Sequence, residues 1–208
     1  MRRVVAIAVS LFLLVASCGS EDGDRVGHTQ QRTLTVFAAA SLKASFTEIG
    51  KKFEAKHDGV TVTFNFAGSS DLVAQMQQGA PADVFASADT RNMEIAVTAN
   101  LLDGIAKDFA TNTLEIATPP GNPAAVDSLD DLAAPGIKVV VCAEQVPCGA
   151  AAKRVEDASG VNISPVSEEQ SVTDVLGKII SGEADAGLVY VTDVKGASDK
   201  VTGVPFPE

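Results

Sequence analysis

Two strand-like stretches of this sequence each run into a serine at the start of a helical pattern. The first ends at Ser41 in TVFAAASLKASFTEI, and the second passes through Ala67-Gly68 to Ser69 in FNFAGSSDLVAQM. The first turn of a helix leaves backbone N–H groups unpaired, and the helix dipole favours negative charge there. Hydroxyl and N–H groups at such positions can hold an anion without a lysine or arginine. Taken alone, each serine is better explained as an ordinary N-cap.

Three further positions have the same character. The loops around Cys148-Gly149 and Ser171-Val172 also precede helical patterns, and Tyr190, the only tyrosine, stands at the end of a strand-like segment. Taken alone, Tyr190 is a half-buried aromatic with its hydroxyl at the surface. In open α/β sheets, however, ligands bind at the carboxyl ends of strands, opposite helix N-termini. The sequence therefore predicts an anion site formed by several helix starts and one strand end.

Strand and helix patterns alternate along the chain from residue 33. We expect strands at 34–37, 60–66, 83–86, 114–117, 137–141 and 186–190. We expect helices at 42–56, 72–78, 91–98, 149–158 and 172–180. This alternation predicts an α/β fold with largely parallel sheets, in which residues 108–113 cross from one sheet to the other.

The N-terminus is typical of an exported protein. A basic start is followed by an apolar run at 4–16, so residues 1–17 are predicted to be a signal peptide. The run ends in VASC, which resembles the lipobox of bacterial lipoproteins and makes Cys18 the expected lipidation site. The alternative is an ordinary signal peptide with an incidental cysteine. Residues 18–32 are almost free of aliphatic side chains and are predicted to form a lipid-anchored, flexible tether.

Charge and cysteine content narrow the possible partners. The chain has 208 residues, 27 acidic against 16 basic side chains and a formal charge of −11, and it lacks a basic patch, so nucleic acid is not an expected partner. Apart from Cys18, it contains Cys142 and Cys148. Export permits a disulfide between these two, and two free thiols are the alternative.

The sequence does not predict an enzyme. His28 falls in the tether and His57 at a polar helix end, so no serine has a base placed beside it by the sequence, and no G-x-S-x-G motif occurs. Cys148 has no evident histidine partner. Two distant histidines do not indicate a metal site, and no cofactor motif is present. A purely structural surface lipoprotein remains an alternative to a receptor.

Several segments together resemble the bacterial molybdate-binding proteins, the extracytoplasmic receptors of molybdate ABC importers. These segments are VFAAASL, AGSSDLVAQMQQGAPADVFASAD, VPCGAAA and GEADAGLVYVTD, and the resemblance covers residues 33–208. It implies a two-lobed periplasmic-binding-protein-like fold of type II, with a mainly parallel sheet in each lobe and the ligand cleft between them. Lobe 1 would comprise residues 33–112 and lobe 2 residues 113–208.

The resemblance also implies a ligand and a site. The ligand would be molybdate or tungstate, with sulfate or another tetrahedral oxyanion as the alternative. The side chains of Ser41, Ser69 and Tyr190 and the backbone N–H groups of Cys148 and Val172 would hold it, so no protein atom would coordinate the metal directly. At Cys148 the chain departs from the family, many members of which have alanine there, and a Cys142–Cys148 bridge would pin the ligand loop.

The same resemblance sets expectations for location and partners. The protein would be a monomer, lipid-anchored through Cys18 at the extracytoplasmic face of the cell membrane, where it would deliver its ligand to a molybdate permease. Members of this family usually continue for a few tens of residues beyond the equivalent of VPFPE and so complete lobe 1. We therefore expect the C-terminal completion of lobe 1 to be missing from this chain.

Overall fold

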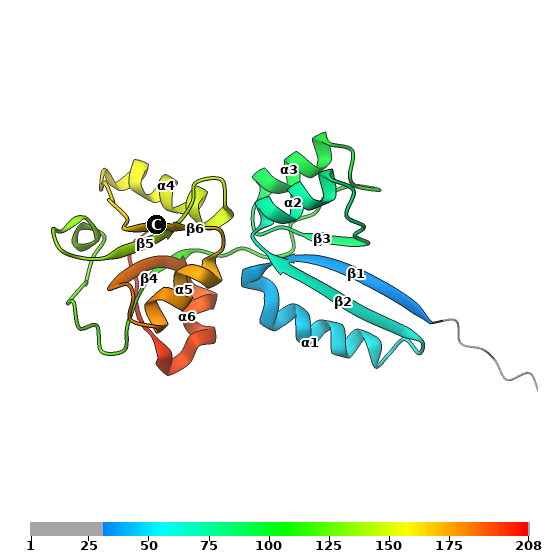
Figure 1. Ribbon diagram of the computed structural model, residues 1–208, viewed down its shortest axis with the longest axis horizontal. Coiled ribbons are helices and arrows are strands. Elements are labelled where there is room, and N and C mark those ends of the chain that lie inside the picture. Colours follow the sequence, from blue (N-terminus) through cyan, green and yellow to red (C-terminus); the bar gives the residue numbers. More distant parts are fainter. Residues whose placement is uncertain (1–30, 208) are drawn as a thin grey trace, which may run out of the picture.

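Two β-sheets, each with its own helices, form the framework of the protein (Figure 1). The structure is a computed structural model and describes residues 31–207. The predicted signal peptide, the lipidation site Cys18 and nearly all of the tether lie outside these residues. The first lobe contains the first sheet and the second lobe contains the second.

The first sheet has the strand order β2-β1-β3, and all of its strands are parallel. Its strands are β1 (Arg32–Ala39), β2 (Val60–Ala67) and β3 (Val84–Ala86). The 3₁₀ turn η1 (Ala40–Leu42) and the helices α1 (Lys43–Glu54), α2 (Ser69–Gln77) and α3 (Thr90–Thr98) accompany them. Neighbouring residues of β1 point to opposite faces, so Val36 packs in one apolar cluster and Phe37 in another.

The second sheet has the strand order β6-β5-β7-β4-β8. Its strands are β4 (Leu114–Thr118), β5 (Val139–Cys142), β6 (Ser167–Glu169), β7 (Ala186–Tyr190) and β8 (Thr202–Val204). The helices are α4 (Pro147–Ser159), α5 (Val172–Ile180) and α6 (Val191–Ala197), with 3₁₀ turns η2 (Asp130–Ala133) and η3 (Ser198–Lys200).

The second sheet is mixed, whereas the sequence predicted a mainly parallel one. β5 runs parallel to β6 and β7, but β4 is antiparallel to both β7 and β8. The chain enters this lobe beside the end of β7, since Leu114 pairs with Tyr190. The entering strand must therefore run away from the end of β7, and this sets its direction opposite to that of β7. The α/β fold class itself is confirmed.

The core of the second lobe is formed by its sheet together with α4, α5, α6 and the turn η2. Strands β5 and β7 are buried along their whole length, as their unbroken apolar runs predict. Val172, Val175 and Ile179 recur at helical spacing on α5 and form its buried face. This packing fixes the first turn of α5 against the carboxyl ends of the strands.

The start of α4 is two residues earlier than the pattern predicted. Pro147 occupies the first helical position, where a missing N–H costs nothing and the fixed φ suits a helix. The helix ends at Gly160, whose φ of 76° is the left-handed conformation typical of such ends. The earlier start brings the backbone N–H of Cys148 into the first turn.

Candidate functional site

A small pocket between the two lobes contains every residue that the sequence assigned to the anion site. Its cavity volume is about 10 Å³, which is near the lower limit for one water molecule. The lining residues are Ala39, Ala40, Ser41, Gly68, Ser69, Ala88, Val146, Pro147, Cys148, Ser171, Val172 and Tyr190. Both lobes contribute, and none of these side chains is normally charged at neutral pH.

Ser69 is fully buried, and its hydroxyl oxygen has a backbone partner. It is the first residue of α2, whose N-cap is Gly68 and has no side-chain cap, so Ser69 is not itself the N-cap. The Ser69 hydroxyl oxygen accepts a hydrogen bond from the N–H of Ala88 at 3.0 Å. Accepting this bond uses a lone pair of the oxygen and not the hydroxyl proton, which can be donated to a ligand. The contact with Ala88 is a backbone feature that residue types alone did not indicate.

Ser41 lies in the turn η1, between β1 and α1. The sequence placed it just ahead of a helix, and the structure inserts a short 3₁₀ turn there. Ser41 is half-buried and lines the pocket together with Ala39 and Ala40. The end of β1 thus reaches the same pocket as the end of β2, as expected for parallel neighbours.

The first turn of α5 brings Val172 to the pocket from the second lobe. Ser171 is the N-cap, and its hydroxyl oxygen accepts the N–H of Asp174 at 3.3 Å. The cap satisfies the N–H group at the third helical position, whereas the N–H of Val172, at the first, has no intrahelical acceptor. A backbone donor is therefore presented by a helix end whose dipole favours an anion.

The first turn of α4 brings Cys148 to the pocket. No side chain caps this helix end. Cys148 is joined by a disulfide to Cys142 at the end of β5, with 5.6 Å between their Cα atoms. The structure therefore contains the bridge that the sequence left open against two free thiols. Both cysteines are buried, so the bridge is part of the packed core of this lobe.

Tyr190 is buried at the end of β7 and is the N-cap of α6. Its backbone N–H donates to Asp193 Oδ2 at 3.1 Å. Burial raises the pKa of the Asp193 carboxyl to about 6, and this hydrogen bond opposes the shift. Asp193 was not among the residues predicted from the sequence, because its pKa depends on packing that the sequence does not show.

We expect Asp193→Asn to stabilise the protein at neutral pH. Because the pKa of Asp193 is raised in the folded state, the folded protein favours the protonated carboxyl. The stability that this preference contributes is fully present below the unfolded pKa and is lost as pH rises through about 6. Asparagine keeps an acceptor for the Tyr190 N–H and removes the buried charge. The free energy of unfolding at pH 7 should rise by about 1 to 3 kcal/mol, with no gain at about pH 4. Urea unfolding at both pH values measures the change in the free energy of unfolding. Asp199→Asn, at an exposed aspartate, is the control. An equal gain in stability of Asp193→Asn at both pH values would show that the buried charge is not the cause.

The two lobes touch beside the pocket. A Cβ atom on Gly68 would overlap the carbonyl oxygen of Gln170, so glycine permits a close approach between the lobes at this point. Arg91 Nη1, from α3, donates to the carbonyl oxygen of Glu144 at 3.5 Å. The first contact lies at the pocket itself, because Gly68 lines it, whereas the second joins the lobes through residues that do not line it.

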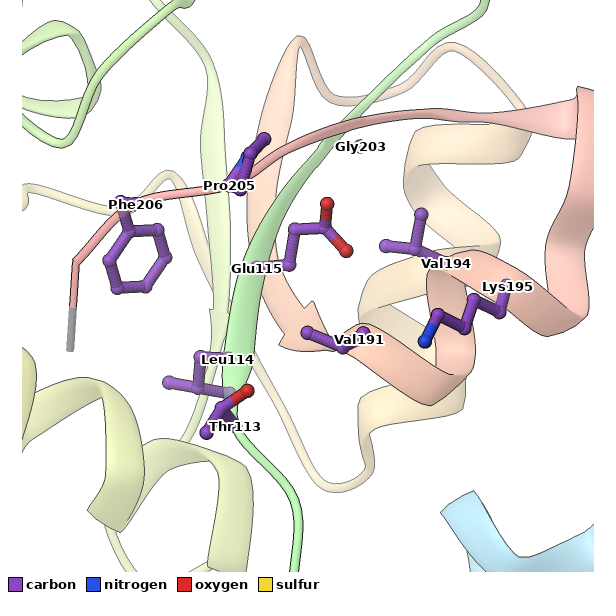
Figure 2. Close-up of a pocket in the computed structure, with 9 residues that line it drawn as sticks. All are labelled: Thr113, Leu114, Glu115, Val191, Val194, Lys195, Gly203, Pro205 and Phe206. Carbon is purple, nitrogen blue, oxygen red and sulfur yellow. The ribbon is translucent and has the colours of Figure 1, made fainter.

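A larger cavity lies elsewhere in the second lobe, between β4, α6 and the segment after β8 (Figure 2). Its volume is about 460 Å³, and it shares no lining residue with the small pocket. The cavity is lined by Thr113, Leu114, Glu115, Val191, Val194, Lys195, Gly203, Pro205 and Phe206. Two of these residues, Glu115 and Lys195, are charged. Glu115 extends from β4 into this space in Figure 2. A carboxylate there disfavours an anion, so size alone does not make this cavity the anion site.

Residues 31–207 offer little to a metal cation or a membrane span. In this range, His, Cys, Asp and Glu form no group of three or more that could hold a metal ion. Within the same residues, none of the helices has the length and apolar character needed to cross a bilayer.

The family model for bacterial extracellular solute-binding proteins matches residues 34–208. The chain belongs to this family. The molybdate-binding protein ModA of Mycobacterium tuberculosis H37Rv is 52% identical over 205 residues, covering 97% of this chain and 78% of that protein. ModA of Escherichia coli K12 is 32% identical over 185 residues, covering 84% of this chain and 72% of that protein.

Solved structures give the same fold for this solute-binding protein. The periplasmic molybdate-binding protein of Azotobacter vinelandii matches with a TM-score of 0.71 and 25% identity, covering 84% of this chain and 79% of that one. The sulfate-binding protein SubI of M. tuberculosis matches with a TM-score of 0.69 and 20% identity, covering 83% and 70% of the two chains. At that identity the second match supports the fold alone.

Proposed function

We propose that this solute-binding protein captures molybdate, and also tungstate, for an ABC importer. The observation that carries the proposal is the composition of the small pocket, in which hydroxyl and backbone N–H groups from both lobes converge without a basic side chain. Its relatives of 52% and 32% identity are named for molybdate binding. The five groups that would hold the anion are Ser41, Ser69, Cys148 N–H, Val172 N–H and Tyr190.

The chemistry of such a pocket favours a fully ionised dianion. A tetrahedral dianion offers only acceptor oxygens, and these suit a set of donors. A protonated phosphate carries a donor of its own, which would be left unsatisfied in this pocket. Sulfate matches molybdate in charge and shape, so discrimination between them depends on size.

Binding would require the lobes to move. An anion with four oxygens is larger than one water molecule, so the closed pocket must open by a hinge motion and close again around the ligand. The contacts of Gly68 with Gln170 and of Arg91 with Glu144 would then form on closure. The loaded receptor would present both lobes to a molybdate permease. The lipid anchor at Cys18 would hold a monomeric receptor beside that permease, and we expect it to have no catalytic turnover and no cofactor.

Thermal unfolding of the chain without its signal peptide tests this function. Melting is followed with no addition and with molybdate, tungstate, sulfate or phosphate. A ligand present at a thousand times its dissociation constant stabilises by about 4 kcal/mol, so even moderate affinity raises the melting temperature. We expect a rise with molybdate and tungstate only. A rise with sulfate alone would change the substrate, and a cooperative transition unaffected by all four anions would refute a receptor for them.

A further inference from the structure

The loop from Cys142 to Cys148 connects the end of β5 with the first turn of α4, and we call it the disulfide loop. The two cysteines are six positions apart and joined by a disulfide. Inside the loop the N–H of Val146 donates to the carbonyl oxygen of Ala143 at 2.9 Å. Cys148 lines the small pocket, whereas Cys142 does not. The bridge therefore ties a pocket residue to a core strand.

The disulfide loop also makes hydrogen bonds to both lobes. Within its own lobe, the N–H of Ala143 donates to the carbonyl oxygen of Glu169 at 2.9 Å, just ahead of the α5 start. Toward the other lobe, the carbonyl oxygen of Glu144 accepts from Arg91 Nη1 at 3.5 Å. A single short loop thus connects the starts of α4 and α5 with the facing lobe.

We propose that Cys142 is a positioning residue for anion binding, acting through its disulfide with Cys148. The disulfide holds the Cys148 N–H toward the pocket and the Glu144 carbonyl toward Arg91, so one covalent bond fixes both a ligand donor and a lobe–lobe contact. This inference rests on the proposed function. Without the bridge, the loop must be ordered at each binding event, and that ordering weakens affinity.

A purely structural disulfide makes a different prediction. Closing a short loop constrains the unfolded chain and so raises the melting temperature. If that were its only role, removing the bridge would lower the melting temperature and leave the affinity of the folded protein unchanged. Affinity measured well below the melting temperature therefore separates the two roles.

The experiment compares the oxidised chain with Cys142→Ala/Cys148→Ala by calorimetric titration with molybdate, at a temperature where both are folded. We expect the dissociation constant to rise about tenfold in the double variant, mainly through faster dissociation, because the unbridged loop must be ordered when the anion binds. Ile179→Val is the control, because it perturbs the buried core of the same lobe near the end of α5, whereas Val172 lines the pocket at the start of that helix. It should lower the melting temperature and leave the dissociation constant unchanged.

A second measurement keeps the test available if the double variant does not fold. A dithiol reductant added to the folded wild-type chain supplies two electrons and two protons, which converts the bridge to two thiols while the reductant becomes a cyclic disulfide. Reduction should produce the same loss of affinity, and oxidation should reverse it. An unchanged dissociation constant without the bridge would overturn this inference alone. No molybdate binding by the oxidised wild-type chain would overturn the proposed function, and this inference with it.

Discussion

Ser69→Ala is expected to weaken molybdate binding by about 10- to 100-fold, the range for loss of a hydrogen bond to a charged group. Ser69 is fully buried, and its hydroxyl oxygen already accepts the N–H of Ala88. The substitution removes the ligand donor and also leaves the Ala88 N–H without its acceptor. Calorimetric titration with molybdate measures the change in the dissociation constant.

The neighbouring serine provides a matched control for this experiment. Ser70 also lies in the first turn of α2, and its buried hydroxyl has no hydrogen-bond partner within residues 31–207. It does not line the pocket. Ser70→Ala should therefore leave the dissociation constant unchanged. Equal losses in the two variants would indicate damage to the helix start and would contradict the role assigned to Ser69.

Gly149→Ala is expected to disrupt the second lobe. A Cβ atom at this position would overlap the carbonyl oxygen of Ala143 and lie 2.6 Å from that of Cys142. Both obstacles are backbone atoms of the disulfide loop, which cannot rotate away as a side chain could. The first turn of α4 would have to move off the end of β5. The free energy of unfolding should fall by about 3 kcal/mol, the upper range for overpacking, as measured by urea unfolding.

Gly177→Ala is the matched control for that substitution. Gly177 also lies in a helix of the second lobe, but a Cβ atom added there would meet no atom of another element within 4 Å. Alanine is the better helix former, so this variant should be more stable than the wild type by about 0.5 to 1 kcal/mol. Losses of similar size in both variants would show that close contact with the disulfide loop is not the cause.

The helix starts of the candidate site could be predicted because their signals are local. A strand pattern, a small or hydroxyl-bearing residue and a helical pattern follow one another at Ser41 and Ser69. At Val172 a serine precedes a helical pattern, although the strand β6 ahead of it was not predicted. Parallel pairing then brings the ends of β1 and β2 together in the first lobe. Packing of α5 on the second sheet brings Val172 to the same pocket from the other lobe. The sequence thus indicated which residues would meet, although not how closely.

Other features depend on contacts that the sequence does not reveal. The direction of β4 follows from where the chain crosses between lobes, so the mixed second sheet was missed. The bond from Ala88 to Ser69 involves a backbone donor, which any residue type would supply. The raised pKa of Asp193 requires burial by segments that are distant in sequence. The close approach of Gly68 to Gln170 depends on how the two lobes are placed, which the sequence does not show.

A crystal structure of the chain grown with molybdate, with molybdenum located by its anomalous scattering, would show directly whether the small pocket is the anion site. We expect one molybdenum atom per chain in this pocket, with its oxygens accepting from Ser41, Ser69, Tyr190 and the N–H groups of Cys148 and Val172. We also expect that no lysine or arginine touches the anion. Molybdenum bound in the larger cavity beside Glu115, or held by basic side chains, would contradict the proposed site.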